Sequence, residues 1–358
     1  MQSRLDAFSR RRSSRWDIDW SESSVGATLL RELSTSILPS GDAATWRRRP
    51  SISLDGTPII LSCKIGRRVD DALRLLVEPG SYAMTVAQQV AFSLTRLDRL
   101  LGLLGWRGAA AEINSITTRV FPSDPAVTSS WWGGIWLGAN VPLSAAGPSS
   151  DADLRLYLNL RHGTAATRWR TLTMLVSQFV PPSLRPVVDQ WSAAVSPHAI
   201  PVGLGVVVAT GRVCAMRAYV GVYNPTLESL SVSSSVFASA TPRELARAHN
   251  SFADRFGLPP QQAITIGYDF IRDMTKAQAM AIGRVKVDFC CHIVAPERRD
   301  KLTPWIELLL AEWRFDSCSL TAFLDDVHAI WENSEVQFLS LGFAPSLNHV
   351  TVYVKPGA

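Results

Sequence analysis

The sequence predicts an α+β protein built on a closed antiparallel β-barrel with a polar lumen, surrounded by helices. In the stretch 154–161 (LRLYLNLR), leucines alternate with Arg155, Tyr157, Asn159 and Arg161, so one face of the strand is apolar and the other polar. Similar strands, each with a cation or tyrosine in the pattern, recur around residues 74, 217, 286 and 353, at intervals of roughly 60 to 80 residues. Helical patterns separate the strand pairs, as in a barrel clad by helices.

Each element follows from local signals along the chain. A short helix is expected at 25–38, and Asp55-Gly56 predicts a tight turn between strands at 52–54 and 59–64. Gly105, Pro181-Pro182 and Gly257 end helices. Further strands are predicted at 67–78, 154–162, 201–208, 213–223, 263–270, 284–293, 336–343 and 349–355. Further helices are predicted at 85–104, 109–120, 166–179, 187–195, 241–257, 300–315 and 319–332.

The chain is expected to form one domain, residues 24–358, after a flexible basic tail at residues 1–23. The tail is rich in arginine and serine and has no apolar segment typical of a signal peptide. No window offers about 18 uninterrupted apolar residues, so no membrane span is expected. The five cysteines are odd in number and contain no C-x-x-C pair, which favours a reduced, cytoplasmic compartment.

Charge and motifs argue against several classes of protein. The net charge of +5 is mild, and the cations lie in alternating strands instead of a cluster typical of nucleic-acid binding. No Walker or Gly-x-Gly-x-x-Gly motif indicates a nucleotide fold. Asp325-Asp326-x-His328 is interpreted as a solvated helix face, because a second aspartate-rich cluster is missing. Cys290, Cys291 and His292 alternate between strand faces, so no metal site is predicted.

The predicted lumen carries cations beside tyrosines. Arg74, Arg155, Arg217 and Lys286 would converge there, and such a group calls for an anion of high charge. Tyr157, Tyr219 and Tyr353 supply hydroxyl donors and ring faces that stabilise a nearby cation. A diphosphate that leaves an allylic carbon needs both features, a cationic clamp and aromatic walls.

With these residues the chain resembles the aromatic prenyltransferases of the dimethylallyltryptophan synthase type, which have the ABBA barrel, and among them the bacterial indole prenyltransferases. The resemblance covers about residues 51–356 and rests on SLDGTPIILSCKIG (53–66), LRLLVEPG (73–80), the Arg/Lys-x-Tyr strands and VTVYVKP (350–356). It implies diphosphate binding by Arg74, Arg155, Arg217 and Lys286, with Tyr157, Tyr219 and Tyr353 shielding the allylic cation. It also implies that no metal or other cofactor is required.

Two positions depart from the family pattern. Ile60 occupies the place where the family usually has a glutamate that binds the indole N–H. The pair Lys286-x-Asp288 has an acid where many members have tyrosine. Ile60 and Trp132 are the expected acceptor-pocket residues, although the tryptophans near 131–136 fit packing of the barrel end as well. No base is assigned; His162 and His292 are the candidates.

The resemblance implies transfer of a dimethylallyl or longer prenyl group to the indole ring of tryptophan or a tryptophan-derived metabolite such as an indolactam. Two alternatives stay open: a phenol or naphthol prenyltransferase on the same barrel, and a non-catalytic barrel that binds an anionic amphiphile. The expected partners are small molecules, without nucleic acid or membrane, and the expected state is a monomer or a weak homo-oligomer.

Overall fold

The computed structural model describes most of the chain. The described residues are 2–15, 25–37, 59–66, 72–80, 84–121, 134–142, 152–223, 225, 242–259, 263–272, 285–343 and 347–355. The predicted strand and turn at 52–56 lie outside these ranges, as does Trp132.

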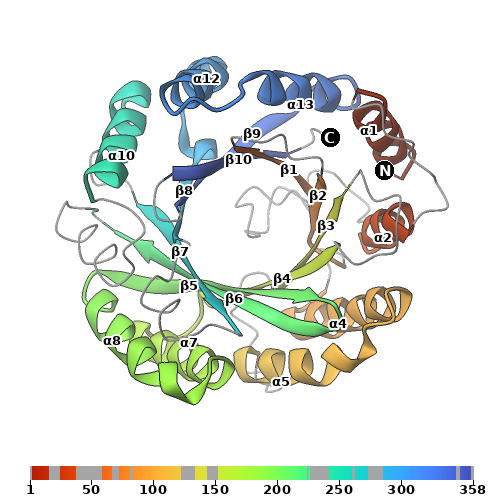
Figure 1. Cartoon of the computed structure of the whole chain (residues 1–358), viewed down its shortest axis with the longest axis vertical. Helices are drawn as coiled ribbons and strands as arrows, with labels where there is room; N and C mark the ends of the chain where they lie inside the picture. The colour runs from red at the N-terminus through yellow and green to blue at the C-terminus, as the bar shows by residue number, and fades with distance from the viewer. Residues whose placement is uncertain are drawn as a thin grey trace.

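Ten strands close into one barrel in which every neighbouring pair is antiparallel (Figure 1). The strands are β1 (Ile59–Gly66), β2 (Ala72–Val77), β3 (Ile135–Pro142), β4 (Asp153–Asn159), β5 (Ala199–Ala209), β6 (Arg212–Val222), β7 (Ile264–Ile271), β8 (Val285–Cys290), β9 (Glu335–Phe343) and β10 (Leu347–Lys355). Strands pair with their sequence neighbours, and β1 pairs with β10 to close the ring. Closure leaves no edge strand in the barrel, and the predicted fold class is confirmed.

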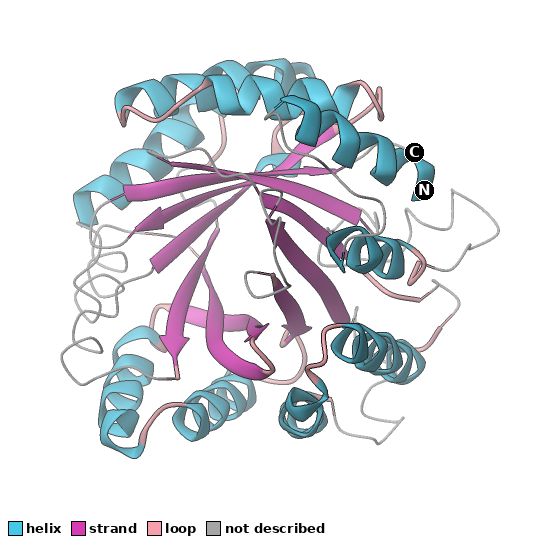
Figure 2. Cartoon of the chain, turned by 45° about the vertical axis from the view of Figure 1, so that its right-hand side comes forward, coloured by secondary structure: helices cyan, strands magenta, loops and turns pink. Residues whose placement is uncertain are grey.

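The helices lie outside the ring, between successive strand pairs (Figures 1 and 2). Those of three turns or more that follow β2 are α4 (Val86–Leu103), α5 (Ala110–Val120), α7 (Ala165–Phe179), α8 (Arg185–Val195), α10 (Pro242–Phe256), α12 (Leu302–Glu312) and α13 (Cys318–His328), and α1 (Gln2–Arg15) and α2 (Val25–Ser34) precede β1. Thr85 begins α4 with a capping box, and Gly105 with φ +71° follows its end.

Period-two alternation determines which strand face is buried between barrel and helices. In β4, Leu154, Leu156 and Leu158 are at most 1% exposed and belong to the apolar core. Arg155 and Tyr157, on the other face, are half-buried and point into the lumen. The same division in the other strands places the apolar core in the ring between barrel and helices, and the polar residues inside.

The sequence analysis does not predict β3. Ile135, Leu137, Ala139 and Val141 alternate in its sequence IWLGANVP and are buried. Gly138, Asn140 and Pro142 between them are depleted in strands and weaken the local signal. In the barrel, β2 pairs with residues 137–142 and β4 with residues 135–140, so the two neighbours together pair with the whole strand.

Residues 2–15 correct the expectation of a flexible tail. They form α1, which lies beside α13 (Figure 1). Leu5 and Phe8 are each 2% exposed, and the Phe8 ring contacts Phe323 and Trp331 at centroid distances of 6.2 and 6.1 Å. Apolar residues spaced by three between the arginines give the segment one buried face.

Asp326 corrects a second expectation, that of a solvated acidic helix face. Asp325 is exposed, but Asp326 is fully buried. Arg11 Nε donates to Asp326 Oδ1 at 2.9 Å, and Arg12 Nη1 lies 3.6 Å from Oδ2. Asp326 therefore anchors α1 to the barrel's helical layer.

The strand around Lys286 is shorter than predicted. β8 ends at Cys290, and residues 291–293 form a 3₁₀ turn, so the backbone at His292 is not part of the strand. The helix expected at 300–315 is also shorter than predicted. It is α12, Leu302–Glu312, and a 3₁₀ segment, Pro296–Lys301, precedes it. Among the described residues, no helix is both long and apolar enough to cross a membrane.

Candidate active site

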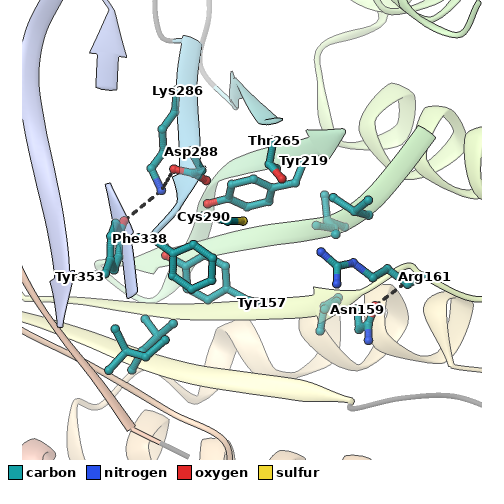
Figure 3. Close-up of a pocket in the computed structure, with 16 residues that line it drawn as sticks. Tyr157, Asn159, Arg161, Tyr219, Thr265, Lys286, Asp288, Cys290, Phe338 and Tyr353 are labelled. Carbon is teal, nitrogen blue, oxygen red and sulfur yellow. Dashed lines mark hydrogen bonds and ion pairs between the residues drawn. The ribbon is translucent and has the colours of Figure 1, made fainter. Parts of the chain in front are cut away.

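A cavity lies in the barrel lumen, and aromatic residues of four strands surround it. Tyr157 of β4, Tyr219 of β6, Phe338 of β9 and Tyr353 of β10 line the cavity together with Lys286 of β8 (Figure 3). Tyr157 and Tyr219 have ring centroids 6.1 Å apart, and Phe338 meets Tyr353 edge-on at 6.4 Å. The three predicted tyrosines are therefore neighbours in space, and Phe338 is an addition that the sequence analysis missed.

Lys286 is held at the centre of these rings. Its Nζ donates to the Tyr353 hydroxyl at 2.9 Å and lies 4.8 and 5.7 Å from the ring centroids of Tyr353 and Tyr219. Burial lowers the pKa of Lys286, but Asp288 at 3.0 Å and the two tyrosines raise it well above its ordinary value. The same lysine lowers the pKa of Tyr353 against the effect of burial. The ammonium group is thus a permanent charge in an aromatic cage.

Arg155 carries its counter-ion on its own strand. Arg155 Nε and Nη2 donate to Asp153 Oδ1 and Oδ2 at 2.6 and 3.0 Å, a two-point pair formed because residues two apart share a strand face. Burial opposes both charges, yet the pair lowers the pKa of Asp153 and raises that of Arg155.

Arg217 pairs with a carboxylate on the next strand. Asp269 of β7 stands directly opposite Arg217 of β6, accepts from Arg217 Nη2 at 2.7 Å and also contacts Nε. Burial lowers the pKa of Arg217, and Asp269 then raises it well above the ordinary value. Asp153-x-Arg155 can be found in the sequence by its spacing, whereas Asp269 becomes a partner only through strand register.

Glycines on the flanking strands make room for Arg217 and Tyr219. A Cβ on Gly267 would lie 2.9 Å from Arg217 Cδ and 3.1 Å from Tyr219 Cε1. A Cβ on Gly205 would lie 3.3 Å from Tyr219 Cε2 and 3.4 Å from Arg217 Cβ. The missing side chains of β5 and β7 therefore allow both residues to lie along the barrel wall.

Arg74 lies on the luminal face of β2, opposite Ser62 and Asn140. Its charge contributes to lowering the pKa of Asp153. Of the four predicted cations, Lys286 lines the cavity, whereas Arg74, Arg155 and Arg217 do not. Electrostatic coupling nevertheless connects Arg155 to Arg217 and Arg217 to Lys286, so the predicted cations form one continuous group along the lumen.

Carboxylates already balance three of these charges, which corrects the expectation that the cations require an external anion in order to coexist. Asp153, Asp269 and Asp288 pair with Arg155, Arg217 and Lys286 respectively. The barrel can therefore form before any anion binds, because each buried charge has a partner.

Of the expected acceptor residues, Ile60 lines the cavity and is 2% exposed. Trp132 lies outside the described residues. Asn159 and Arg161 also line the cavity (Figure 3). Both belong to the polar face that alternation predicts for 154–161, but the sequence analysis assigned neither of them a role. Arg161 lies two residues past the end of β4.

Of the two histidine candidates, the structure places His162 outside the cavity. His162 Nε2 lies 3.1 Å from the carbonyl oxygen of Val120, and its ring stacks on Phe121 at 6.2 Å, next to α5. Burial and then Arg168 lower the pKa of His162 to about 4. His162 is not among the residues that line the cavity, and the side chain of His292 lies outside the described residues. Within the described ranges, no three histidine, cysteine or acidic residues are grouped to hold a metal ion.

This closed ring of paired strands clad by helices defines the fold as the ABBA barrel of the prenyltransferases. Solved structures share it over nearly the whole chain. The 5-dimethylallyltryptophan synthase from Streptomyces coelicolor superposes with a TM-score of 0.74 at 14% identity, covering 99% of this chain and 96% of that one. The 6-dimethylallyltryptophan synthase from Micromonospora olivasterospora, in complex with DMASPP and Trp, gives 0.73 at 15%, with the same coverage.

The apo form of the prenyltransferase PriB gives a TM-score of 0.75 at 15% identity, covering 99% of this chain and 96% of PriB. No family model matches the sequence. No curated protein matches it either. Identities this low establish the fold, and the resemblance read from the sequence is confirmed at that level.

Proposed function

We propose that this protein is an aromatic prenyltransferase that moves a dimethylallyl or longer prenyl group from its diphosphate to the indole ring of tryptophan or a tryptophan-derived metabolite. The observation that carries the proposal is the group of Lys286, Tyr219 and Tyr353 in the lumen of an ABBA barrel, continued along the wall by Arg217 and Arg155. The diphosphate is bound by Arg74, Arg155, Arg217 and Lys286.

In the proposed reaction, the C–O bond of the donor breaks and the diphosphate leaves with the electron pair. The fixed cations stabilise the developing negative charge, and the rings of Tyr157, Tyr219 and Tyr353 face the allylic cation. The indole ring then attacks the cation. Because the cations are already paired with carboxylates and the rings are packed against one another, little reorganisation is needed during the reaction.

The proposal includes independence from metal ions and other cofactors, because permanent positive charges occupy the place where Mg²⁺ would act on a diphosphate. It also includes a monomer or weak homo-oligomer that works in the cytoplasm on small molecules, without nucleic acid or membrane.

The test is pyrophosphate release from dimethylallyl diphosphate in excess EDTA, with tryptophan, cyclic indole peptides, indolactams and simple phenols as acceptors. We expect pyrophosphate release and a prenylated product with at least one indole. The rate in EDTA should equal the rate measured with Mg²⁺. Activity that appears only with Mg²⁺ would contradict the proposed clamp.

One observation favours a phenol or naphthol acceptor as the second candidate. Ile60 presents an aliphatic surface to the cavity and offers no carboxylate for an indole N–H. Turnover of phenols but no indole in the same assay would establish this alternative. Binding of the donor without pyrophosphate release in the presence of any acceptor would instead indicate a barrel that only binds anionic amphiphiles.

A further inference from the structure

Asp288 is a carboxylate inside the aromatic cavity. It lies on β8, two residues after Lys286, so both side chains point into the lumen (Figure 3). Its side chain is 14% exposed. Among the described residues that line the cavity, Asp288 is the only acid; the other polar members are tyrosines, cations, Asn159, Thr265 and Cys290.

The two oxygens of Asp288 have different surroundings. Lys286 Nζ lies 3.0 Å from Oδ1, and the Ser340 hydroxyl of the neighbouring strand β9 donates to the same Oδ1. No described residue donates a hydrogen bond to Oδ2. One oxygen is therefore used to fix the carboxylate, and the other keeps its acceptor capacity toward the cavity.

The other lining groups are poorly suited to accept a proton. Burial raises the pKa of the Cys290 thiol to about 12, and burial likewise raises the pKa of Tyr219, so both stay protonated. Lys286 is a cation, and Arg161 is a guanidinium. His162, the described histidine candidate, is turned toward Val120 and Phe121.

We propose that Asp288 is a catalytic base, whose Oδ2 takes the proton that the aromatic acceptor must lose. This inference rests on the proposed function. After the C–O bond of the donor breaks, an electron pair of the ring forms a bond from the ring carbon to the allylic carbon. That ring carbon becomes tetrahedral, and the rest of the ring carries the positive charge. The C–H bond at that ring carbon then breaks, its proton goes to Asp288 Oδ2, and its electron pair restores the aromatic ring. Asp288 leaves the step as a carboxylic acid and returns the proton to solvent when the product departs.

The charge of Asp288 suits this sequence of events. Asp288 balances the charge of Lys286, and a bound diphosphate would give Lys286 a second, more highly charged partner. The carboxylate then faces the cationic ring, which it stabilises before it accepts the proton.

The test uses the full-length Asp288→Asn variant. Its amide oxygen can keep the contacts of Oδ1, while its NH₂ group replaces the accepting Oδ2 with a donor. We expect binding of the unreactive dimethylallyl thiolodiphosphate within about threefold of the unaltered protein, and product formation at least about 100-fold slower. With a ring-deuterated indole acceptor, we also expect the variant to show a primary isotope effect above about 2, because proton removal has become slow.

Ser340→Ala is the matched control, since it removes a contact to Oδ1 and leaves Oδ2 in place. We expect less than about a tenfold loss and no new isotope effect. Product formation by Asp288→Asn within about threefold of normal, without an isotope effect, would show that another group, such as the departing diphosphate, takes the proton. Loss of thiolodiphosphate binding would overturn the inference in favour of Asp288 as a residue that only positions Lys286. If the unaltered protein prenylates no acceptor, the proposed function itself fails.

Discussion

At the scale of single residues, the site consists of charges that come with their own counter-ions. Arg217 and Asp269 are paired across two strands, and Asp269 is only 8% exposed. Replacing Arg217 alone would leave that carboxylate buried without its cation, which costs about 3–5 kcal/mol in comparable pairs. A variant designed to test diphosphate binding must therefore remove both partners, or loss of binding cannot be separated from loss of stability.

The sequence predicts the cations and tyrosines of this site because alternation identifies the luminal face of each strand. It does not predict Asp269 as the partner of Arg217, since that contact depends on the register of β6 against β7. Ile60 in the cavity is predicted from the position of a motif. Arg161 lies on the polar face that alternation predicts, but no motif gives it a role.

The glycine next to Arg217 provides a prediction at this scale. Gly267→Ala places a methyl group 2.9 Å from Arg217 Cδ and 3.1 Å from Tyr219 Cε1, so both side chains must shift. We expect affinity for dimethylallyl thiolodiphosphate, measured by calorimetry, to fall about tenfold, because a shift of charged groups by a few tenths of an ångström weakens a preorganised site.

Gly203→Ala is the control for that substitution. Its Cβ would meet Tyr219 only at 3.8 Å, and its nearest neighbour is a backbone oxygen at 3.4 Å. We expect nearly unchanged affinity. Equal losses in the two variants would show that the close packing of β7 against Arg217 and Tyr219 is irrelevant to binding.

At the scale of elements, α1 shows how a polar sequence can be part of the fold. Its arginine-rich composition is typical of a tail, and the two buried apolar residues Leu5 and Phe8 are too few to predict a packed helix by themselves. The deciding contact is with Asp326, more than 300 residues away in the sequence. A long-range ion pair leaves no local pattern, so the sequence analysis assigned Asp326 to the surface and α1 to a tail.

The anchoring of α1 can be tested with neighbouring aspartates. Asp326→Ala leaves Arg12, which is 3% exposed, without its carboxylate, and we expect a loss of about 3 kcal/mol in the free energy of unfolding. Urea denaturation measures the loss, and limited trypsin digestion should cleave within α1 first. Asp325→Ala, one residue earlier and exposed, should change stability by less than about 0.5 kcal/mol. If the two variants unfold at the same urea concentration, the Arg12–Asp326 contact does not anchor α1.

At the scale of the whole molecule, the closed barrel places all luminal residues on strands that belong to one continuous sheet. Each strand pairs with two neighbours, and the leucine and valine side chains of the outer faces pack under helices all around the ring. The repeated alternation of strand pairs and helices makes this architecture predictable from sequence. β3 is not predicted because Gly138, Asn140 and Pro142 weaken the strand signal of its alternating apolar residues, and its pairing with β2 and β4 is visible only in the structure.

The last prediction concerns the effect of a bound anion on the thermal stability of the barrel. A ligand that binds only the folded barrel stabilises it by about 2.7 kcal/mol at 100 times its dissociation constant. For a chain of 358 residues this corresponds to an increase in Tm of about 3–4 °C. We expect inorganic pyrophosphate in EDTA to give such a shift in calorimetry, because Arg155, Arg217 and Lys286 carry permanent charges.

The double variant Arg217→Met with Asp269→Asn should fold and lose most of that shift, since removing both members of a buried pair is close to neutral for stability while the diphosphate loses one of its cations. Arg119→Met, on the exposed face of α5, removes the same charge outside the barrel and should keep the full shift. The double variant keeps the net charge of the protein, whereas Arg119→Met lowers it by one. A shift that falls in Arg119→Met would therefore mean that pyrophosphate responds to the net charge of the protein and not to the luminal cations. A shift that survives in the double variant would place the binding site away from Arg217.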